Sequence, residues 1–330
     1  MKKTVYFFWA VGFVLLAFLI GHQGAADVAS AIAVAGWGLP LVVAYRLVPM
    51  LADTISWQTL LPHSHRRPFS ELLWMRWIGD AINTLLPVAQ VGGELVRARL
   101  LNKAGIPGAW AGASIVVDLT TGVLMQMIFA LTGVGLLLYF GIGADAVFGI
   151  TLAICVFILL IFGFYLAQSG GMFLSLSRVL ERLAEDRDWL SQLTTAAMLD
   201  RTVARMYRRR VRFIKACAWR FLTWMLGAGE VWLAMCFLGY PVSILEAIML
   251  ESLGNAIRST AFLIPGALGV QEGGYILLGS FLGIGAETAL ALSLIKRVRE
   301  LVWGIPGLIS WQLVEGRRFF KGAAEPASVD

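Results

Sequence analysis

The sequence predicts an all-α polytopic membrane protein, on the strength of its composition and of two kinds of apolar segment. Hydrophobic residues make up 58% of the 330 residues and charged residues only 15%, whereas soluble domains carry about 25% charged residues. Several apolar runs approach the roughly 20 residues that a spanning helix needs. Two longer apolar stretches contain charged residues, glycine and proline, as do helices that break inside a membrane. We therefore expect about six full transmembrane helices plus two re-entrant helix pairs.

The six full spans are expected where apolar residues run without interruption. The chain begins Met1-Lys2-Lys3 and continues with an apolar run, which resembles a signal peptide, but no convincing small-residue cleavage site follows. We therefore expect this run to be retained as the first helix. The six runs lie at about 5–20, 28–51, 109–131 with a continuation to 140, 146–167, 216–238 and 286–313.

The two interrupted stretches, at about 69–103 and 242–282, resemble each other. The string Gly79-Asp80-Ala81-Ile82 in the first matches Gly254-Asn255-Ala256-Ile257 in the second, an offset of 254 − 79 = 175. Glu94 matches Glu272 at an offset of 272 − 94 = 178. Corresponding interrupted segments in two halves are typical of transporters built from repeats. Within a single membrane domain, 1–330, we expect repeat 1 at about 69–140, repeat 2 at about 242–313 and a disordered tail at about 316–330.

Basic residues predict the orientation of the chain. Between residues 168 and 215, ten Lys and Arg outnumber five Asp and Glu, so this segment carries 10 − 5 = +5 of the net charge of +6. We expect it to be a cytoplasmic basic loop, because Lys and Arg favour the cytoplasmic side. The short loops expected outside, at 21–27, 141–145, 239–241 and 283–286, contain no Lys or Arg. Both termini are then cytoplasmic, and the two repeats are inverted.

The breaks in the two interrupted stretches are expected to line a cavity. Unpaired backbone groups persist inside a membrane only where protein or a wet cavity satisfies them. The helix amino termini at 87–94 and 265–272 offer N–H donors that suit anionic groups such as phosphate. Glycine lets the backbone turn and approach a ligand closely. The backbone residues predicted to contact the substrate are Gly92, Gly93, Pro265, Gly266 and Gly269.

Charged residues in the apolar segments are expected to face the protein interior and pair, because an unpaired charge in the bilayer costs a few kcal/mol or more. Glu94 and Arg97 are three residues apart and share a helix face. For Arg97 and Arg99, extension to the cytoplasmic edge of the membrane is the alternative. Asp118 is expected to pair with a basic residue of the last span, and the repeat offset points to Lys296, since 118 + 178 = 296. The charged residues assigned to substrate binding or translocation are Glu94, Arg97, Asp118, Arg258, Glu272, Arg297 and Arg299.

The remaining motifs predict neither a metal nor a cofactor. His63-x-His65 lacks a third ligand, so a solvated loop is the simpler interpretation, and the three cysteines have no CxxC spacing. The arginines between Arg201 and Arg212 either contact anionic lipid headgroups or only anchor the topology. No catalytic motif is present, no folded basic domain suggests nucleic acid, and Glu230 has no assignable partner.

Three motifs resemble the lysylphosphatidylglycerol synthase/flippase transmembrane domain family. They are Val91-Gly92-Gly93-Glu94-x-x-Arg97, Pro265-Gly266-Ala267-Leu268-Gly269-x-x-Glu272, and Arg299 followed by Pro306-Gly307. The fuller strings are most similar to the hopanoid-biosynthesis-associated branch, the HpnL type. The resemblance implies a lipid-translocating domain, often a homodimer, in the bacterial inner membrane, with a hopanoid or related polar-headed lipid as cargo. Many members carry an acidic-Arg pair in the third span, where this chain has Asp118-Leu119.

The sequence therefore favours a transporter or flippase for membrane lipids, either hopanoid or phospholipid, and not an enzyme. Two alternatives stay open. A membrane-embedded lipid-modifying transferase also suits paired acids and arginines in a cavity, and a scaffold for a lipid-biosynthesis complex needs no cavity at all.

Overall fold

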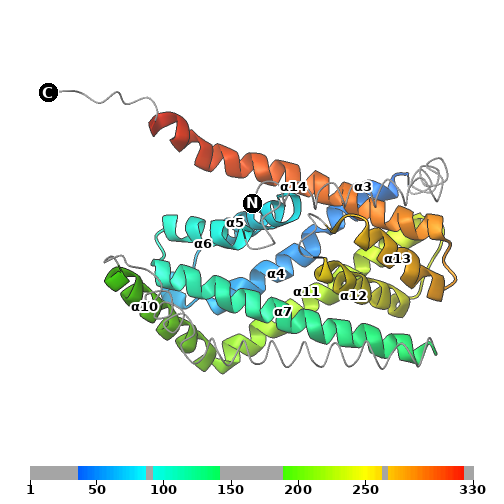
Figure 1. The fold of residues 1–330 in the computed structure, drawn as a ribbon, viewed down its shortest axis with the longest axis horizontal. Helices are drawn as coiled ribbons and strands as arrows, with labels where there is room; N and C mark the ends of the chain where they lie inside the picture. Colours follow the sequence, from blue (N-terminus) through cyan, green and yellow to red (C-terminus); the bar gives the residue numbers. More distant parts are fainter. Residues whose placement is uncertain (1–35, 87–91, 142–188, 262–266, 323–330) are drawn as a thin grey trace.

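The computed structural model describes residues 36–86, 92–141, 189–261 and 267–322, and within these ranges the chain is helical with no strand (Figure 1). The predicted helical class is confirmed. The predicted spans at 5–20 and 146–167 lie outside the described residues. The elements are α3 (Gly38–Tyr45), α4 (Leu47–Leu60), the 3-10 turn η1 (His63–His65), α5 (Phe69–Leu85), α6 (Gly92–Lys103), α7 (Gly108–Tyr139), α10 (Trp189–Arg208), α11 (Arg210–Phe237), α12 (Ile244–Thr260), α13 (Val270–Phe281) and α14 (Ala286–Gly322).

Two parts of the described chain are long and apolar enough to cross a membrane: α3 with α4, and α7. The observed α7 agrees with the run predicted at 109–140. The run predicted to end at residue 51 instead continues through α4 to Leu60. Its polar residues mark no end to the helix, because they face inward: Ser56 donates a hydrogen bond to the Ala216 carbonyl at 2.9 Å, and Thr54 is fully buried.

Each interrupted stretch forms two helices, as the helix breakers predict. In the first stretch α5 packs on α6, and in the second α12 packs on α13. The breaks themselves, at 87–91 and 262–266, lie outside the described residues, and with them Pro265 and Gly266. Glycine is required at the start of α6, because a Cβ on Gly93 would lie 2.1 Å from the Gly79 carbonyl oxygen of α5. Gly269 caps α13 with a φ of +79°, which favours glycine.

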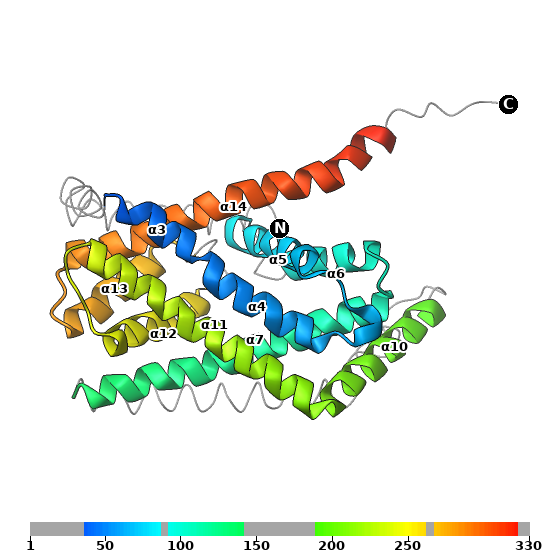
Figure 2. The ribbon, with the colours of Figure 1, turned by 180° about the vertical axis from the view of Figure 1, so that it is seen from behind.

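Helices from the two halves of the chain pack on each other. The most extensive of these contacts are α4 with α11, α5 with α14, and α7 with α12. In Figures 1 and 2, α14 and α7 run along opposite sides of the molecule with the shorter helices between them. Glycines allow close approach: a Cβ on Gly133 of α7 would lie 2.1 Å from Ser252 Oγ of α12, and one on Gly304 of α14 would lie 2.5 Å from Leu85 of α5.

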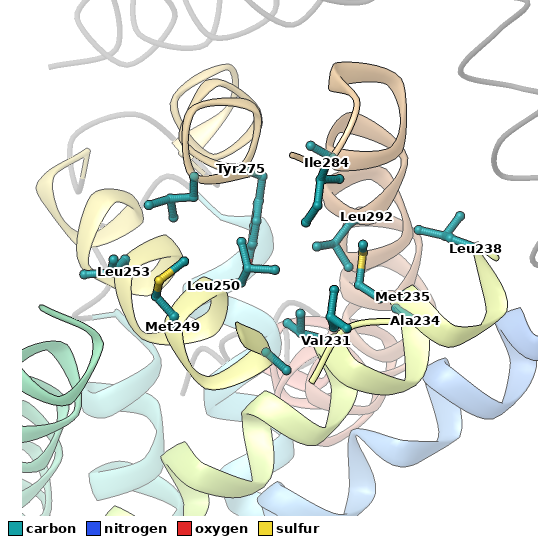
Figure 3. Close-up of a cluster of buried hydrophobic side chains, with 14 of the residues drawn as sticks. Val231, Ala234, Met235, Leu238, Met249, Leu250, Leu253, Tyr275, Ile284 and Leu292 are labelled. Carbon is teal, nitrogen blue, oxygen red and sulfur yellow. The ribbon is translucent and has the colours of Figure 1, made fainter. Parts of the chain in front are cut away.

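An apolar cluster joins α11, α12, α13 and α14 at one end of the molecule. Figure 3 shows Val231 and Met235 of α11 converging with Leu250 of α12, Tyr275 of α13 and Leu292 of α14. All five side chains are almost fully buried. This packing holds the four helices that carry the charged residues of the second half.

The described part of the predicted basic loop is helical. Helix α10 packs along α7, where Val203, Met206 and Tyr207 bury against Ala113 and Val117. Arg201, Arg205 and Arg208 of the same helix are exposed. Helix α14 continues to Gly322, and the rest of the predicted tail lies outside the described residues.

Candidate functional site

Asp118 lies at the centre of a buried ion-pair network formed by four further helices. Its carboxylate accepts hydrogen bonds from Arg76 of α5 at 2.8 Å, from Arg97 of α6 at 2.8 Å, and from Arg220 of α11. Arg97 also contacts Glu94 at 2.7 Å, and Asp53 of α4 pairs with Arg76 at 2.7 Å and with Arg220. We call this group the first network: Asp53, Arg76, Glu94, Arg97, Asp118 and Arg220.

Arg97 is fixed inside the protein rather than at the membrane edge. Only 1% of its surface is exposed, and its guanidinium lies 4.2 Å from the centre of the Trp57 ring, a cation–π contact. This excludes extension of Arg97 to the cytoplasmic edge. The predicted pairing of Glu94 with Arg97 is confirmed.

The prediction that Asp118 pairs with the last span is wrong. All of its arginine partners lie on α5, α6 and α11, and Lys296 of α14 instead pairs with Glu251 of α12. Arg76 and Arg220 were not predicted as site residues. Neither has an acid partner three or four residues away that it contacts, and their partners Asp53 and Asp118 lie on other helices.

A second network joins α11, α12, α13 and α14. Arg299 donates to Glu230 at 2.7 Å, which supplies the partner that the sequence did not reveal. Arg297 contacts Glu272 at 2.9 Å and Glu300 at 3.1 Å. We call this group the second network: Glu230, Glu251, Arg258, Glu272, Lys296, Arg297, Arg299 and Glu300.

Neutral groups complete the second network. Lys296 donates to the Tyr275 hydroxyl at 2.9 Å in addition to pairing with Glu251. Arg258 pairs with Glu300 and donates to the Gln271 side-chain oxygen at 2.9 Å. Each cation of this network therefore has at least one carboxylate partner, as buried charges require.

A polar cavity of about 310 Å³ lies between the two networks. Helices from both halves of the chain form its wall. A partly exposed ion pair, Arg46 between α3 and α4 with Asp80 of α5 at 3.5 Å, also lines the cavity. The charged lining residues are Arg46, Asp53, Asp80, Arg220, Glu251, Arg258, Lys296, Arg299 and Glu300.

Of the predicted substrate residues, Arg258 and Arg299 line this cavity. Glu94, Arg97 and Asp118 belong to the first network, and Glu272 and Arg297 belong to the second. These five residues do not line the cavity and lie behind the residues that do. Gly92 and Gly93 begin α6, where the Gly93 N–H donates to Asn83 at 2.8 Å. The Gly269 N–H donates to Glu272 at 2.7 Å, so Glu272 also caps α13.

No group of three metal-ligating side chains occurs among the described residues. His63 and His65 lie in the turn η1, and the His65 ring stacks on Trp110 with centres 5.1 Å apart. Cys217 and Cys236 are free thiols on α11.

Residues 8–307 match the family model described as the lysylphosphatidylglycerol synthase TM region. The chain belongs to this family. It is 24% identical over 290 residues to a UPF0104 membrane protein of Pyrococcus horikoshii, covering 83% of this chain and 85% of that protein. It is 26% identical over 241 residues to a UPF0104 membrane protein of Methanothermobacter thermautotrophicus, covering 68% and 69%.

Membership of the lysylphosphatidylglycerol synthase TM region family establishes a membrane location and connects the protein with lipids. In the third span Leu119 follows Asp118, and the arginines that pair with Asp118 come from three other helices. Tertiary packing therefore supplies the partners of this buried acid.

Proposed function

We propose that this protein is a lipid transporter that moves a polar-headed lipid across, or from, the bacterial inner membrane. The observation that carries the proposal is the polar cavity between two buried ion-pair networks in a membrane protein. Charged residues within membrane helices are rare and usually line a pathway or a water-filled cavity. The hopanoid-associated branch that the sequence resembles supplies the specific proposal of a hopanoid or related lipid as cargo.

The architecture we propose is six full spans with two re-entrant helix pairs as inverted repeats. Corresponding contacts support it. Arg76–Asp118 in the first half matches Glu251–Lys296 in the second, at offsets of 251 − 76 = 175 and 296 − 118 = 178. The contact of Asn83 with Gly93 matches that of Arg258 with Gln271, at offsets of 175 and 178.

The packing of helices supports the same relation. Under these offsets α5 corresponds to α12 and α7 to α14. The repeat relation therefore turns the pair of α5 with α14 into the pair of α12 with α7, and both pairs are observed. A substrate site at the interface of two repeats is typical of such transporters. The proposal further includes cytoplasmic termini, a homodimer and no catalytic turnover.

A pair of matched variants tests whether the cavity holds a lipid. Thr223 of α11 lines the cavity, whereas Thr132 of α7 does not. Each hydroxyl donates to the carbonyl four residues earlier at 3.0 Å, so the two threonines have similar local roles. Thr223→Phe fills part of the cavity, and Thr132→Phe adds the same bulk elsewhere.

Lipids that co-purify with wild type and both variants in mild detergent are identified by mass spectrometry. We expect one polar lipid to be enriched over the bulk membrane extract in wild type and Thr132→Phe, and to be depleted in Thr223→Phe. The proposal is abandoned if all three proteins carry only bulk lipid in the same proportions. The identity of the enriched lipid tests the hopanoid cargo separately.

A further inference from the structure

We propose that the corner where α10 meets α11 is a binding surface for the headgroups of anionic phospholipids, separate from the cavity and independent of its cargo. The two helices form a V at the end of the molecule opposite to α13 (Figures 1 and 2). The sequence left open whether the arginines of this region contact lipid or only set the topology. We call the exposed basic residues of the V the basic corner: Arg201, Arg205, Arg208, Arg209, Arg210 and Lys215.

The basic corner carries a concentrated positive charge. All six of its residues are exposed, and the only acid between residues 197 and 219, Asp200, is 7% exposed. The exposed charge of this described stretch is therefore +6. The guanidinium of Arg205 lies 5.8 Å from the centre of the Trp110 ring, a contact that holds the side chain without neutralising its charge. A surface of this kind attracts anionic groups.

The arginines of α10 form one face of a helix that is fixed in place. The exposed residues between 197 and 208 are Met198, Arg201, Arg205 and Arg208. They recur every three or four residues and so share one face. The opposite face packs on α7 through Val203, Met206 and Tyr207. The arginines are thus arranged before any ligand arrives, which lowers the entropic cost of binding.

Exposed apolar residues begin directly after the basic corner and indicate the level of the membrane. Val211 and Ile214 at the start of α11 are 67% and 64% exposed, and Leu222, three turns further on, is 40% exposed. In a membrane protein an exposed apolar face of this kind contacts acyl chains. Because Arg210 immediately precedes Val211, the basic corner lies where the acyl chains end and the phosphates begin.

Membrane lipid fits the basic corner better than a soluble acidic partner does. An acidic protein matches the charge but leaves Val211 and Ile214 without an apolar contact. An anionic phospholipid satisfies both, since its phosphate meets the arginines while its acyl chains cover the apolar face. Basic clusters beside membrane helices bind anionic lipid in this way.

Photocrosslinking of the full chain in reconstituted vesicles tests the surface. Two probes, phosphatidylglycerol (net charge −1) and phosphatidylcholine (net charge 0), carry a diazirine near the glycerol end of one acyl chain. Each is added in trace amounts to phosphatidylcholine vesicles, and labelled peptides are quantified by mass spectrometry. The peptide containing Val211 and Ile214 reports the basic corner.

The opposite end of the molecule supplies the internal reference. Leu277 and Phe281 of α13 are 54% and 43% exposed, and the loop at 282–285 that follows contains no Lys or Arg. We expect the ratio of phosphatidylglycerol to phosphatidylcholine labelling to be at least about tenfold higher at the basic corner than at α13, since each basic residue near an anionic lipid strengthens binding about fivefold.

A charge-removing variant and a matched charge-keeping variant locate the effect. Arg208→Gln with Arg209→Gln and Arg210→Gln is expected to lower the ratio at the corner at least about fivefold. Lysine at the same three positions keeps the charge and the topology signal, so it is expected to keep most of the preference. All three positions are exposed, and elution from a sizing column checks that both variants fold. In wild type, about 1 M salt is expected to weaken the preference, because the Debye length falls to about 3 Å.

Several results would overturn the inference. Equal ratios at the basic corner and at α13 in wild type exclude a preference for anionic lipid and leave the charge to a soluble acidic partner. A preference that the glutamine variant keeps, or that the lysine variant loses, contradicts attraction by these charges. A large excess of soluble glycerophosphoglycerol is expected to leave labelling unchanged, and its loss would assign the surface to free phosphate compounds. None of these measurements depends on transport, so their failure leaves the proposed function standing.

Discussion

Replacing Asp118 with asparagine is expected to cost the fold a large part of its stability. The substitution keeps the shape of the side chain and removes the carboxylate that three arginines share. The first network then has three bases against two acids, a net charge of +1, in a region where the Arg76 and Arg97 side chains are 3% and 2% exposed. Removing one partner of a buried ion pair costs about 3–5 kcal/mol, against a total stability of about 5–15 kcal/mol.

Thermal unfolding in detergent, followed by sizing-column fluorescence, measures this loss. Arg67→Gln is the matched control, because the Arg67–Glu71 pair has a similar 2.7 Å contact but side chains 34% and 39% exposed. Pairs of this exposed i,i+4 kind are worth about 0.3–0.5 kcal/mol. We expect a midpoint lower by the order of 10 °C for Asp118→Asn and little change for the control. Equal unfolding midpoints for Asp118→Asn and Arg67→Gln would refute the view that the buried ion pairs of the first network stabilise the fold.

A second substitution in the Asp118→Asn variant tests whether stability depends on the charge balance of the first network rather than on any single contact. Arg220→Gln removes one of the three bases, so Asp118→Asn with Arg220→Gln returns the network to two acids and two bases. We expect the double variant to be more stable than Asp118→Asn alone, since residues in one network are coupled by about 0.5–3 kcal/mol. A double variant less stable than both single variants would contradict neutrality as the governing requirement.

Two further predictions concern packing and the second network. Gly93→Ala is expected to lower stability by about 1–3 kcal/mol through overpacking, because its Cβ would meet the Gly79 carbonyl. Gly135→Ala on α7 is the control: no atom lies within 4 Å of the new Cβ, so the variant is expected to be neutral or slightly stabilising. Equal unfolding midpoints for the two variants would contradict the close contact of α5 with α6. Lys296→Met is expected to lower the free energy of unfolding by about 3–5 kcal/mol, because it leaves Glu251 without its cation. The double variant Lys296→Met with Glu251→Gln is expected to recover most of this stability. A double variant as unstable as Lys296→Met would contradict a stabilising role of this ion pair.

The helical class followed from hydropathy, and the division of the two interrupted stretches followed from helix breakers. Apolar runs gave α7 almost to the residue, and glycine and proline separated α5 from α6 and α12 from α13. The end of α4 at Leu60 was missed because the apolar run stops at residue 51, before the polar residues Asp53 and Ser56. Polar residues that face a protein interior do not end a helix, and hydropathy alone does not distinguish that interior from water.

The site was predicted in part, because sequence identifies charged residues inside the membrane but not the helix that each one faces. Local spacing was enough for Glu94 and Arg97, which lie on one helix turn. Glu230 and Arg299 are 69 residues apart, and Arg220 lies 102 residues from Asp118. Such contacts depend on which helices pack together. The cavity-lining residues Arg46 and Asp53 were missed for the same reason.

The mistaken partner of Asp118 has an instructive cause. The offset of 178 residues was used to connect Asp118 with Lys296, but that offset relates corresponding positions, and corresponding positions need not touch. Each of the two residues makes its own contact with a residue in the same half: Asp118 with Arg76, and Lys296 with Glu251. The sign of the charge is reversed between these contacts while the pairing is kept. In a membrane interior the free energy depends on whether a charge is compensated and not on which helix carries the acid. Substitutions that exchange acid and base together are therefore expected to preserve the pairing, whereas a change of either residue alone leaves a buried charge without its partner.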